Sequence, residues 1–367
     1  MYDGIEIDML SLGNADCILV SFYNGASVHR VLIDGGNKGD APTIRAFLRG
    51  LNITKIDDIL STHLHDDHSG GLIDILADNT LTFGKFWCHV PHWHVENKNM
   101  DKVWAALKSA GTSDEATNIR KSLETVATLY NIAKDRGIPH EEPFKGKLIG
   151  NLVVCSPAEE FYNGLAVEMT DVEKIRAEDA AQVRYDEQTT LEEIIYKGIF
   201  GDALAGSSLL SDPHTPPENE SSAVTAAAQG GKTFLFTADA GTCALSNALR
   251  DYQIAGLHWM QIPHHGSRRN LTESLIETFA PNVAFVSAVG NDKHPRKAVV
   301  NAFKKLGASV YSTHYPAPGH LKYAVGQVPP RTGYDPATPL FEDKKPLTKK
   351  SGPDWSTGLA AILGGKR

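Results

Sequence analysis

The sequence predicts an α/β protein built as a four-layer αββα sandwich with a helical or irregular insertion. Both halves of the chain contain short β-rich runs separated by turn residues, and segments with helical spacing lie between them. Two such halves bury their apolar faces best as two sheets packed face to face, with helices on the outside. No boundary between independent domains is visible, so we expect one domain over residues 1–326.

In the first half, strands and helices alternate up to and beyond the first polar motif. The expected strands are 5–12, 16–23, 31–36 and 56–63, with a helix at 41–51. The next helix spans 69–78, with Ser69 as its N-cap. Two further helices with an amphipathic pattern are expected at 101–110 and 113–135.

The second half repeats this alternation. The expected strands are 221–228, 232–239, 257–267, 283–290 and 309–314, and the expected helices are 243–252 and 296–307. Residues 158–218 are polar and acidic with weak periodicity, which we interpret as an insertion or lid outside the core. Residues 327–367 are rich in Pro, Gly and Lys, and we expect a partly irregular C-terminal extension there.

Composition places the chain among ordinary globular proteins, since 41% of its 367 residues are hydrophobic and 22% are charged. No apolar run approaches the ~20 residues that span a bilayer, which argues against a membrane channel. The opening MYDGIEIDML lacks a basic region and an apolar signal core, so we expect a cytoplasmic protein. The four cysteines are far apart with no CxxC pair, which favours buried thiols over disulfides.

Charge is unevenly distributed along the chain. The net charge is −8, but residues 261–367 contain 15 Lys and Arg against 7 Asp and Glu. That segment therefore carries +8, and residues 1–260 carry −16. The acidic total argues against indiscriminate nucleic-acid binding. The basic final third fits either an anionic substrate held there or a solvated surface with a Lys-rich tail.

The segment STHLHDDHSGG, residues 61–71, crowds metal-binding side chains at the end of a predicted strand. His63 and His65 are two residues apart, so their side chains point the same way from an extended strand end. Asp67 and His68 follow where the chain turns into a helix, and the Gly-Gly pair after them allows close approach. This geometry can place the first imidazole pair on one metal and Asp67 with His68 on another. Imidazole and carboxylate ligands favour zinc, with manganese or iron as alternatives.

The pattern HxHxDHxGG resembles the signature of the metallo-β-lactamase-fold hydrolases. Later segments are similar to the C-terminal hydrolase domain of the competence DNA-uptake protein ComEC. In chain order they are VLIDGG with Asp34, NESSAV with Asn219 and Ser222, LFTADAG with Asp239, IPHHGS with His264 and His265, and SAVGNDKHP with Asn291 and His294. The resemblance covers residues 4–325 except 158–218, and it implies the metallo-β-lactamase sandwich and two divalent metal ions.

The resemblance also implies roles for the metal ligands. Asp239 would bridge both metals, and one of His264 and His265 would join Asp67 and His68 on the second metal. His264, which lies nearer the strand end, is the preferred ligand, although either histidine satisfies the pattern.

Asp34 would orient a ligating histidine, as carboxylates behind metal ligands commonly do, or it is simply a turn aspartate. Many members of the superfamily supply a third histidine to the first metal. ComEC-like members lack this ligand. The candidates here, none in a recognisable motif, are His89, His92, His94, His140 and His214. A second departure is Ala238, which precedes Asp239 where relatives usually have glycine.

Two metals ~3.5–4 Å apart can activate water and clamp both oxygens of an in-line displacement at phosphorus, with no serine or cysteine nucleophile. Asp67 and His294 are the expected catalytic residues. His294 would protonate the leaving oxygen, or it would instead cap the following helix. Phosphoryl oxygens would contact Asn219, Ser222, Ser267 and Asn291. Further phosphates would contact Arg268, Arg269, Lys293, Arg296 and Lys297, unless these side chains are solvated.

Three functions follow from these observations. The first is a metal-dependent phosphodiesterase, in particular a nuclease, acting on an anionic phosphoester such as single-stranded DNA. The second is a hydrolase of a small-molecule phosphoester, lactone or thioester. The third is a non-catalytic partner in a multi-protein system, for example one of phage defence. The sequence identifies no protein partner and gives no reason to expect membrane association.

Overall fold

The computed structural model describes residues 2–95, 114–171, 209–210, 213–290, 294–331 and 340, with side chains from 117 onward in the helix that begins at 114. Within these residues the strands form two sheets of seven. The first sheet contains, in spatial order, β14 (Leu321–Gly326), β1 (Gly4–Met9), β2 (Ile18–Asn24), β3 (Ser27–Ile33), β4 (Lys55–Leu60), β5 (Thr82–Trp87) and β6 (His140–Glu141).

The second sheet mirrors the first in its mixture of antiparallel and parallel pairs. Its spatial order is β13 (Ser309–Ser312), β12 (Val283–Val286), β11 (Trp259–Gln261), β10 (Lys232–Phe236), β9 (Val224–Gln229), β8 (Leu152–Ser156) and β7 (Leu148–Ile149). In both sheets the strands that precede the polar motifs are parallel: β3 with β4, and β10 with β11. Parallel neighbours bring their carboxyl ends to the same edge, which places the motifs of each half together.

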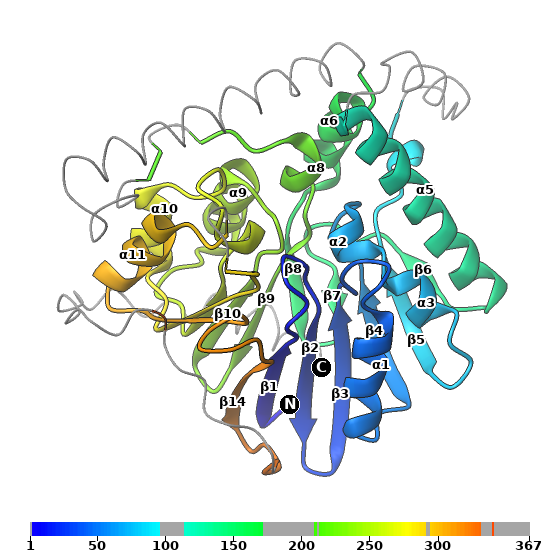
Figure 1. Ribbon diagram of the computed structural model, residues 1–367, viewed down its shortest axis with the longest axis horizontal. Helices are drawn as coiled ribbons and strands as arrows, with labels where there is room; N and C mark the ends of the chain where they lie inside the picture. The colour runs from blue at the N-terminus through cyan, green and yellow to red at the C-terminus, as the bar shows by residue number, and fades with distance from the viewer. Residues whose placement is uncertain are drawn as a thin grey trace.

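Helices cover the outer face of each sheet (Figure 1). The first sheet packs against α1 (Ala41–Gly50), α3 (Leu72–Leu76) and α5 (Asp114–Asp135). The second sheet packs against α9 (Thr242–Tyr252), α10 (Glu273–Phe279) and α11 (Lys297–Lys305). The predicted four-layer αββα architecture is therefore confirmed.

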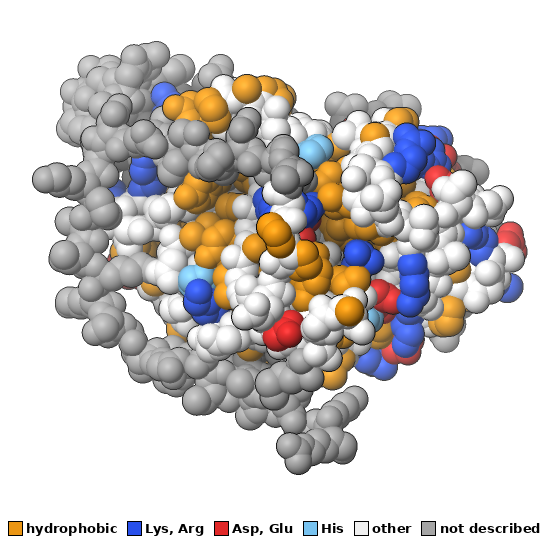
Figure 2. Space-filling view, turned by 90° about the horizontal axis from the view of Figure 1, so that it is seen from below, with side chains coloured by type: hydrophobic (Ala, Val, Ile, Leu, Met, Phe, Trp, Pro, Cys, Tyr) orange, Lys and Arg blue, Asp and Glu red, His pale blue; other side chains and the backbone are white. Residues whose placement is uncertain are grey.

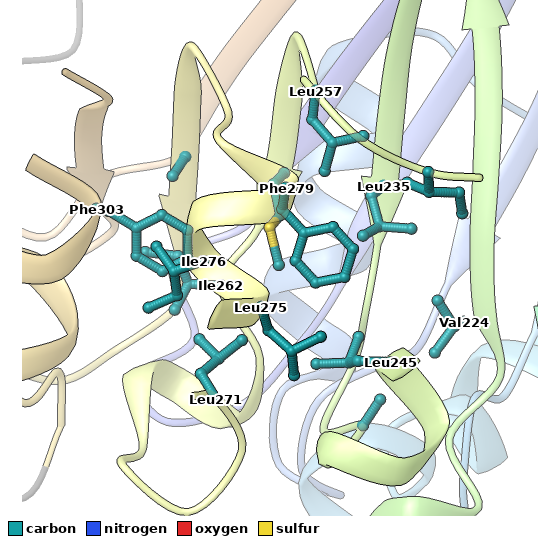
Figure 3. Close-up of a cluster of buried hydrophobic side chains, with 14 of the residues drawn as sticks. Val224, Leu235, Leu245, Leu257, Ile262, Leu271, Leu275, Ile276, Phe279 and Phe303 are labelled. Atoms are coloured by element: carbon teal, nitrogen blue, oxygen red, sulfur yellow. The ribbon is translucent and has the colours of Figure 1, made fainter. Parts of the chain in front are cut away.

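Three apolar layers separate the four structural layers. Between the sheets, Phe22 of the first meets Phe234 and Trp259 of the second in one buried cluster. Under the helices of the second sheet, Phe279 of α10 points toward Leu235 of β10, and Leu275 of α10 points toward Leu245 of α9 (Figure 3). Successive apolar residues on a strand thus pack alternately into two different cores, as expected for a sheet covered on both faces.

Most predicted elements are present, with two corrections. The helix expected at 69–78 is interrupted: α2 (Asp66–Ser69) ends at Ser69, and α3 begins at Leu72 with Gly71 as its N-cap. The start of the expected insertion belongs to the core, because α6 (Glu159–Met169) buries Tyr162 and Met169 on one face. Weak periodicity concealed this helix, since a short amphipathic face needs only a few apolar positions.

Other expectations fall partly or wholly outside the described residues. The helix expected at 101–110, most of the 158–218 insertion and nearly all of the extension after 331 lie there. The cysteine prediction holds for Cys17, Cys88 and Cys155, which are buried, but is wrong for Cys243, which is exposed near the start of α9.

Among the described helices, none is both long and apolar enough to cross a membrane. The lower face of the molecule carries hydrophobic side chains across its middle, with Lys and Arg mostly to one side (Figure 2).

Candidate metal centre

The polar motifs meet where the strands of both sheets end. His63 follows β4, Asp239 follows β10, and His265 follows β11, while short α2 carries Asp67 and His68. These side chains form two groups whose potential ligand atoms lie within 4.8 Å of one another. The first group contains His63, His65 and Asp239, and the second contains Asp67, His68, Asp239 and His265.

The first group is built on the imidazole pair of the HxH motif. His63 Nε2 lies 3.2 Å from His65 Nδ1 and 3.9 Å from Asp239 Oδ2. His63 and Asp239 are buried, and His65 is partly exposed. The ring nitrogens of His63 and His65 therefore converge on one oxygen of a buried carboxylate.

The second group uses the other oxygen of the same carboxylate. His68 Nε2 lies 3.2 Å from Asp239 Oδ1, and His265 Nε2 lies 3.4 Å from Asp67 Oδ2. Asp239 thus presents one oxygen to each group, which is the arrangement of a carboxylate that bridges two cations.

A second observation also indicates that these residues could hold a metal ion. His68 Nε2 and Asp239 Oδ1 are fully buried and lie 3.2 Å apart, and apart from this ion-pair contact neither atom has a hydrogen-bond partner within the described part of the chain. Buried polar atoms are normally satisfied, because leaving one unpaired costs roughly 1–3 kcal/mol. A divalent cation coordinated by both atoms would satisfy them, and imidazole with carboxylate suits zinc as well as manganese or iron.

The pKa values of the site histidines are shifted in different directions. Burial disfavours a charged His68, but the carboxylates of Asp239 and Asp34 outweigh it and raise its pKa well above the ordinary value. Burial and the neighbouring imidazoles of His68 and His65 lower the pKa of His63 well below the ordinary value. Burial also opposes charge on His265, but Asp67 and other carboxylates raise its pKa to about 9. A metal that binds His68 and His265 must therefore displace protons from them.

Asp34 holds the outer nitrogen of a candidate ligand. Its carboxylate accepts hydrogen bonds from Thr62 N at 2.8 Å and Thr62 Oγ1 at 2.7 Å, and His68 Nδ1 lies 2.8 Å from Asp34 Oδ2. His68 therefore donates from Nδ1 and presents Nε2 to the second group. The contact is that of an orienting carboxylate, the first of the two readings of Asp34.

The two adjacent histidines of IPHHGS point into different surroundings. His265 directs Nε2 to the second group, and its Nδ1 lies 3.0 Å from the carbonyl oxygen of Ser287. His264 belongs to neither group: its Nδ1 lies 3.0 Å from Asn270 Oδ1, and its Nε2 lies 3.7 Å from Asp239 Oδ2. The geometry therefore favours His265 as the ligand, where the motif favoured His264.

His294 lies beside these histidines and does not cap the following helix. Its ring centroid is 5.8 Å from that of His264 and 5.9 Å from that of His265. The N-cap of α11 is Arg296, two residues further along the chain. Burial, with a further contribution from the neighbouring histidines, lowers the pKa of His294 to about 3, so its ring is neutral near pH 7.

The expected phosphoryl contacts divide into three cases. Asn219 Nδ2 lies 3.4 Å from Asp239 Oδ2, and Asn219 Oδ1 and Ser222 Oγ are buried without a hydrogen bond in the described residues. Ser267 Oγ accepts from Arg269 N at 3.2 Å and so supports the local turn. Asn291 lies outside the described residues.

The neighbouring cations and mid-chain histidines differ in exposure: Lys297 and His214 are exposed, Arg296 is partly buried, and Lys293 lies outside the described residues. Arg268 and Arg269 are buried, and Arg269 Nε donates to the His214 carbonyl at 2.9 Å. The expected third-histidine candidates are absent from both metal groups among the described residues. His89, for example, stacks on Tyr162 with ring centroids 4.2 Å apart.

Sequence reasoning missed three residues that support the site. Asn270 donates through Nδ2 to the carbonyl of Asp239 at 2.8 Å. Gln261 donates to Asp16, and both are buried. The available signal for Asp16 was a lone carboxylate directly before the apolar run CILV, where a buried charge needs partners.

Comparisons with known proteins add the following. A protein-family profile described as Anti-Pycsar protein Apyc1 matches residues 8–154, which is less than half of the chain. A search of curated protein sequences gave no match. The resemblance to ComEC therefore remains a prediction from motifs.

Solved structures similar to the chain are distant. The metallo-beta-lactamase fold protein YhfI from Bacillus subtilis is 9% identical, with 88% of this chain and 100% of that one covered and a TM-score of 0.41. AidC, a dizinc quorum-quenching lactonase, is 13% identical over 61% of this chain and 56% of its own, with a TM-score of 0.30. The metallo-beta-lactamase SMB-1 is 12% identical over 69% and 78%, with a TM-score of 0.29. Likenesses this weak decide nothing about the chemistry.

Proposed function

We propose that the protein is a metal-dependent phosphodiesterase that uses two divalent cations. One observation supports this above all others: the two oxygens of Asp239 face two separate groups of imidazole and carboxylate ligands. His63 and His65 would hold one cation, and Asp67, His68 and His265 the other. When bound, such a pair lowers the pKa of water and stabilises negative charge on phosphoryl oxygens.

The protein's own groups have the remaining tasks. Asp34 fixes the ring of His68, and Asn219 contacts both Asp239 and His264. The neutral ring of His294 offers a hydrogen bond to a substrate oxygen beside His264 and His265. Because its pKa is so low, a role as the proton donor expected from the sequence is disfavoured.

The substrate class we propose is a short or small phosphodiester. The arginines next to the histidine pair are 3% and 7% exposed, for Arg268 and Arg269 respectively, so few phosphates can reach them. The net charge of −8 also weakens binding to a long duplex. Single-stranded ends fit this description as well as small molecules do.

The profile match supports a proposal about the biological context, namely a role in a defence system. The name Anti-Pycsar protein Apyc1 fits the expectation that the chain acts in the context of a defence system. Hydrolysis of a small phosphodiester is compatible with such a role.

One experiment tests the proposal. Metal-free protein is loaded with zinc or manganese, the bound metal is counted, and turnover is measured on bis-(p-nitrophenyl) phosphate and on single-stranded DNA. Asp239→Asn should lose bound metal and lower turnover by several orders of magnitude, because both cations share this residue. His294→Ala should keep its metal and lower turnover by about 10²–10³-fold, the usual loss when one hydrogen-bond donor to a developing oxyanion is removed.

The matched control is Asp58→Asn. Asp58 is a buried carboxylate of β4 that pairs with His29 and Trp87, away from the metal groups. Its substitution should leave metal content unchanged. Normal turnover in Asp239→Asn would refute the two-cation site, and cleavage of the small ester with inert DNA would remove the nuclease reading.

A further inference from the structure

Asp16 is a buried carboxylate that belongs to neither of the two proposed metal groups. It lies between β1 and β2, with 1% of its surface exposed. It forms a separate group with Asp34 and His68, in which its Oδ2 lies 3.8 Å from His68 Nδ1. An isolated carboxylate is costly to bury, so its hydrogen-bond partners indicate what it is there to hold.

One oxygen of Asp16 reaches His265. Ser287 Oγ donates a short hydrogen bond to Asp16 Oδ1, and His265 Nδ1 lies 3.0 Å from the Ser287 carbonyl and 3.1 Å from its hydroxyl. A ring nitrogen that faces a carbonyl oxygen must carry the hydrogen. His265 Nδ1 therefore donates to Ser287, and Nε2 is the nitrogen left for Asp67 or for a cation.

The other oxygen of Asp16 reaches the loop of Asp239. Gln261 Nε2 donates to Asp16 Oδ2 at 2.8 Å. The side-chain oxygen of Gln261 accepts the backbone N–H groups of Thr237 and Ala238, each at 3.1 Å. These residues directly precede Asp239. Gln261 therefore links Asp16 by hydrogen bonds to the loop that carries Asp239.

The backbone of Asp16 contacts the part of the site that comes from the first sheet. Its N–H donates to the Asp67 carbonyl at 3.1 Å, and its carbonyl accepts from Gly36 N at 2.8 Å. Asp16 thus touches the segments that carry Asp34, Asp67, Asp239 and His265, which come from both sheets.

We infer that Asp16 is a positioning residue that aligns the second metal group by holding the Ser287 hydroxyl against His265 Nδ1 and by fixing the loop of Asp239. The inference rests on the proposed metal pair. It assigns Asp16 to the Asp67–His68–Asp239–His265 group and not to His63 and His65, because no hydrogen bond of its side chain reaches those two in the described structure.

Asp16→Asn tests the inference, because asparagine keeps the shape but cannot accept from Ser287 and Gln261 as a carboxylate does. Zinc titration of the full chain should show one cation bound as in the wild type and the second bound about 10–100-fold more weakly. Histidine ring nitrogens followed by NMR in metal-free protein should show a shifted Nδ1 signal for His265, because a carboxylate no longer holds the Ser287 hydroxyl in place. Asp58→Asn should change neither result.

Ser287→Ala provides an independent variant if Asp16→Asn does not fold. It removes the hydroxyl link but keeps the carbonyl acceptor, so the second affinity should fall by less than in Asp16→Asn. An unchanged second affinity together with an unchanged His265 ring signal, in either variant, would overturn the role of Asp16. If wild-type protein binds no cation, the metal pair fails instead, and the NMR comparison still decides whether Asp16 orients the ring of His265 through Ser287.

Discussion

At the scale of single residues, the candidate site is a place of backbone strain. Asp34, Ala238, His264 and His265 all have positive φ, at 60°, 47°, 49° and 52°. Non-glycine residues occupy this region at a cost of about 1–3 kcal/mol, and they persist where surrounding contacts hold them. Here the contacts include Thr62 on Asp34 and Gln261 on the loop of Ala238.

Ala238→Gly is expected to raise the free energy of unfolding by up to about 1 kcal/mol. Relief of the left-handed Cβ gains roughly 1–2 kcal/mol, and the extra entropy of unfolded glycine removes about 0.5–1 kcal/mol. Urea denaturation measures the difference. Ala248→Gly, in the buried face of α9, is the control and should destabilise by about 1 kcal/mol or more. A similar loss for Ala238→Gly would show that the φ of Ala238 carries no strain.

At the scale of elements, glycines decide how closely α2 and α3 approach the end of β3. A Cβ on Gly71 would lie 2.0 Å from the carbonyl oxygen of Gly35, and one on Gly70 would lie 2.9 Å from the backbone nitrogen of Lys38. Backbone hydrogen bonds use this closeness, with Gly35 N donating to His68 O at 2.7 Å. The close approach predicted from the Gly-Gly pair is confirmed, and it brings His68 to Asp34.

Gly71→Ala should therefore separate α3 from the loop after β3. We expect a loss of about 1–3 kcal/mol in unfolding free energy, typical of overpacking, together with weaker binding of metal by His68. Gly164→Ala is the matched control, because the added Cβ meets nothing within 4 Å in α6. Alanine should stabilise that helix by roughly 0.5–1 kcal/mol. Thermal melts with metal counting distinguish the two, and wild-type behaviour of Gly71→Ala would contradict the close packing.

At the scale of the whole molecule, strands distant in sequence pair at the edge of the first sheet. β1 is antiparallel to β14, with Gly4 opposite Gly326. Arg331 Nη2 then lies 2.6 Å from Asp8 Oδ2 and 2.7 Å from Glu6 Oε2, so residues beyond β14 are tied back to β1. Burial raises the pKa of Asp8 to about 6, although Arg331 opposes the shift.

This carboxyl predicts a pH dependence of stability. Its pKa in the unfolded chain is about 3.9, so between about pH 4 and pH 6 the folded protein retains a proton that the unfolded chain has lost. The unfolding free energy should therefore fall as pH rises through this window, by roughly 3 kcal/mol in total. Asp8→Asn should lack this contribution. Urea denaturation from pH 4 to pH 7 gives the difference between the two proteins, and a difference that does not change with pH would exclude Asp8 as its source.

Local sequence patterns sufficed for much of the fold and part of the site. Short β-rich runs between turn residues predicted most of the strands, because β-branched and aromatic side chains suit a buried, pleated surface. The spacing of His63, His65, Asp67 and His68 indicated a metal group, since neighbours on one strand-to-helix turn converge with little help from the rest of the chain. The glycines after them indicated close packing for the same local reason.

Tertiary structure alone decided the contacts between segments more than a hundred residues apart. Adjacent His264 and His265 satisfy the motif equally well in one dimension, and only the folded structure places the ring of His265 against Asp67, with Nε2 3.4 Å from Oδ2. Asp16 carries no motif, and its partners Gln261 and Ser287 lie across the interface between the sheets. The sequence by itself determined which side chains are available at each strand end, because local geometry follows from local residues. The packing of one sheet on the other determined which of them meet.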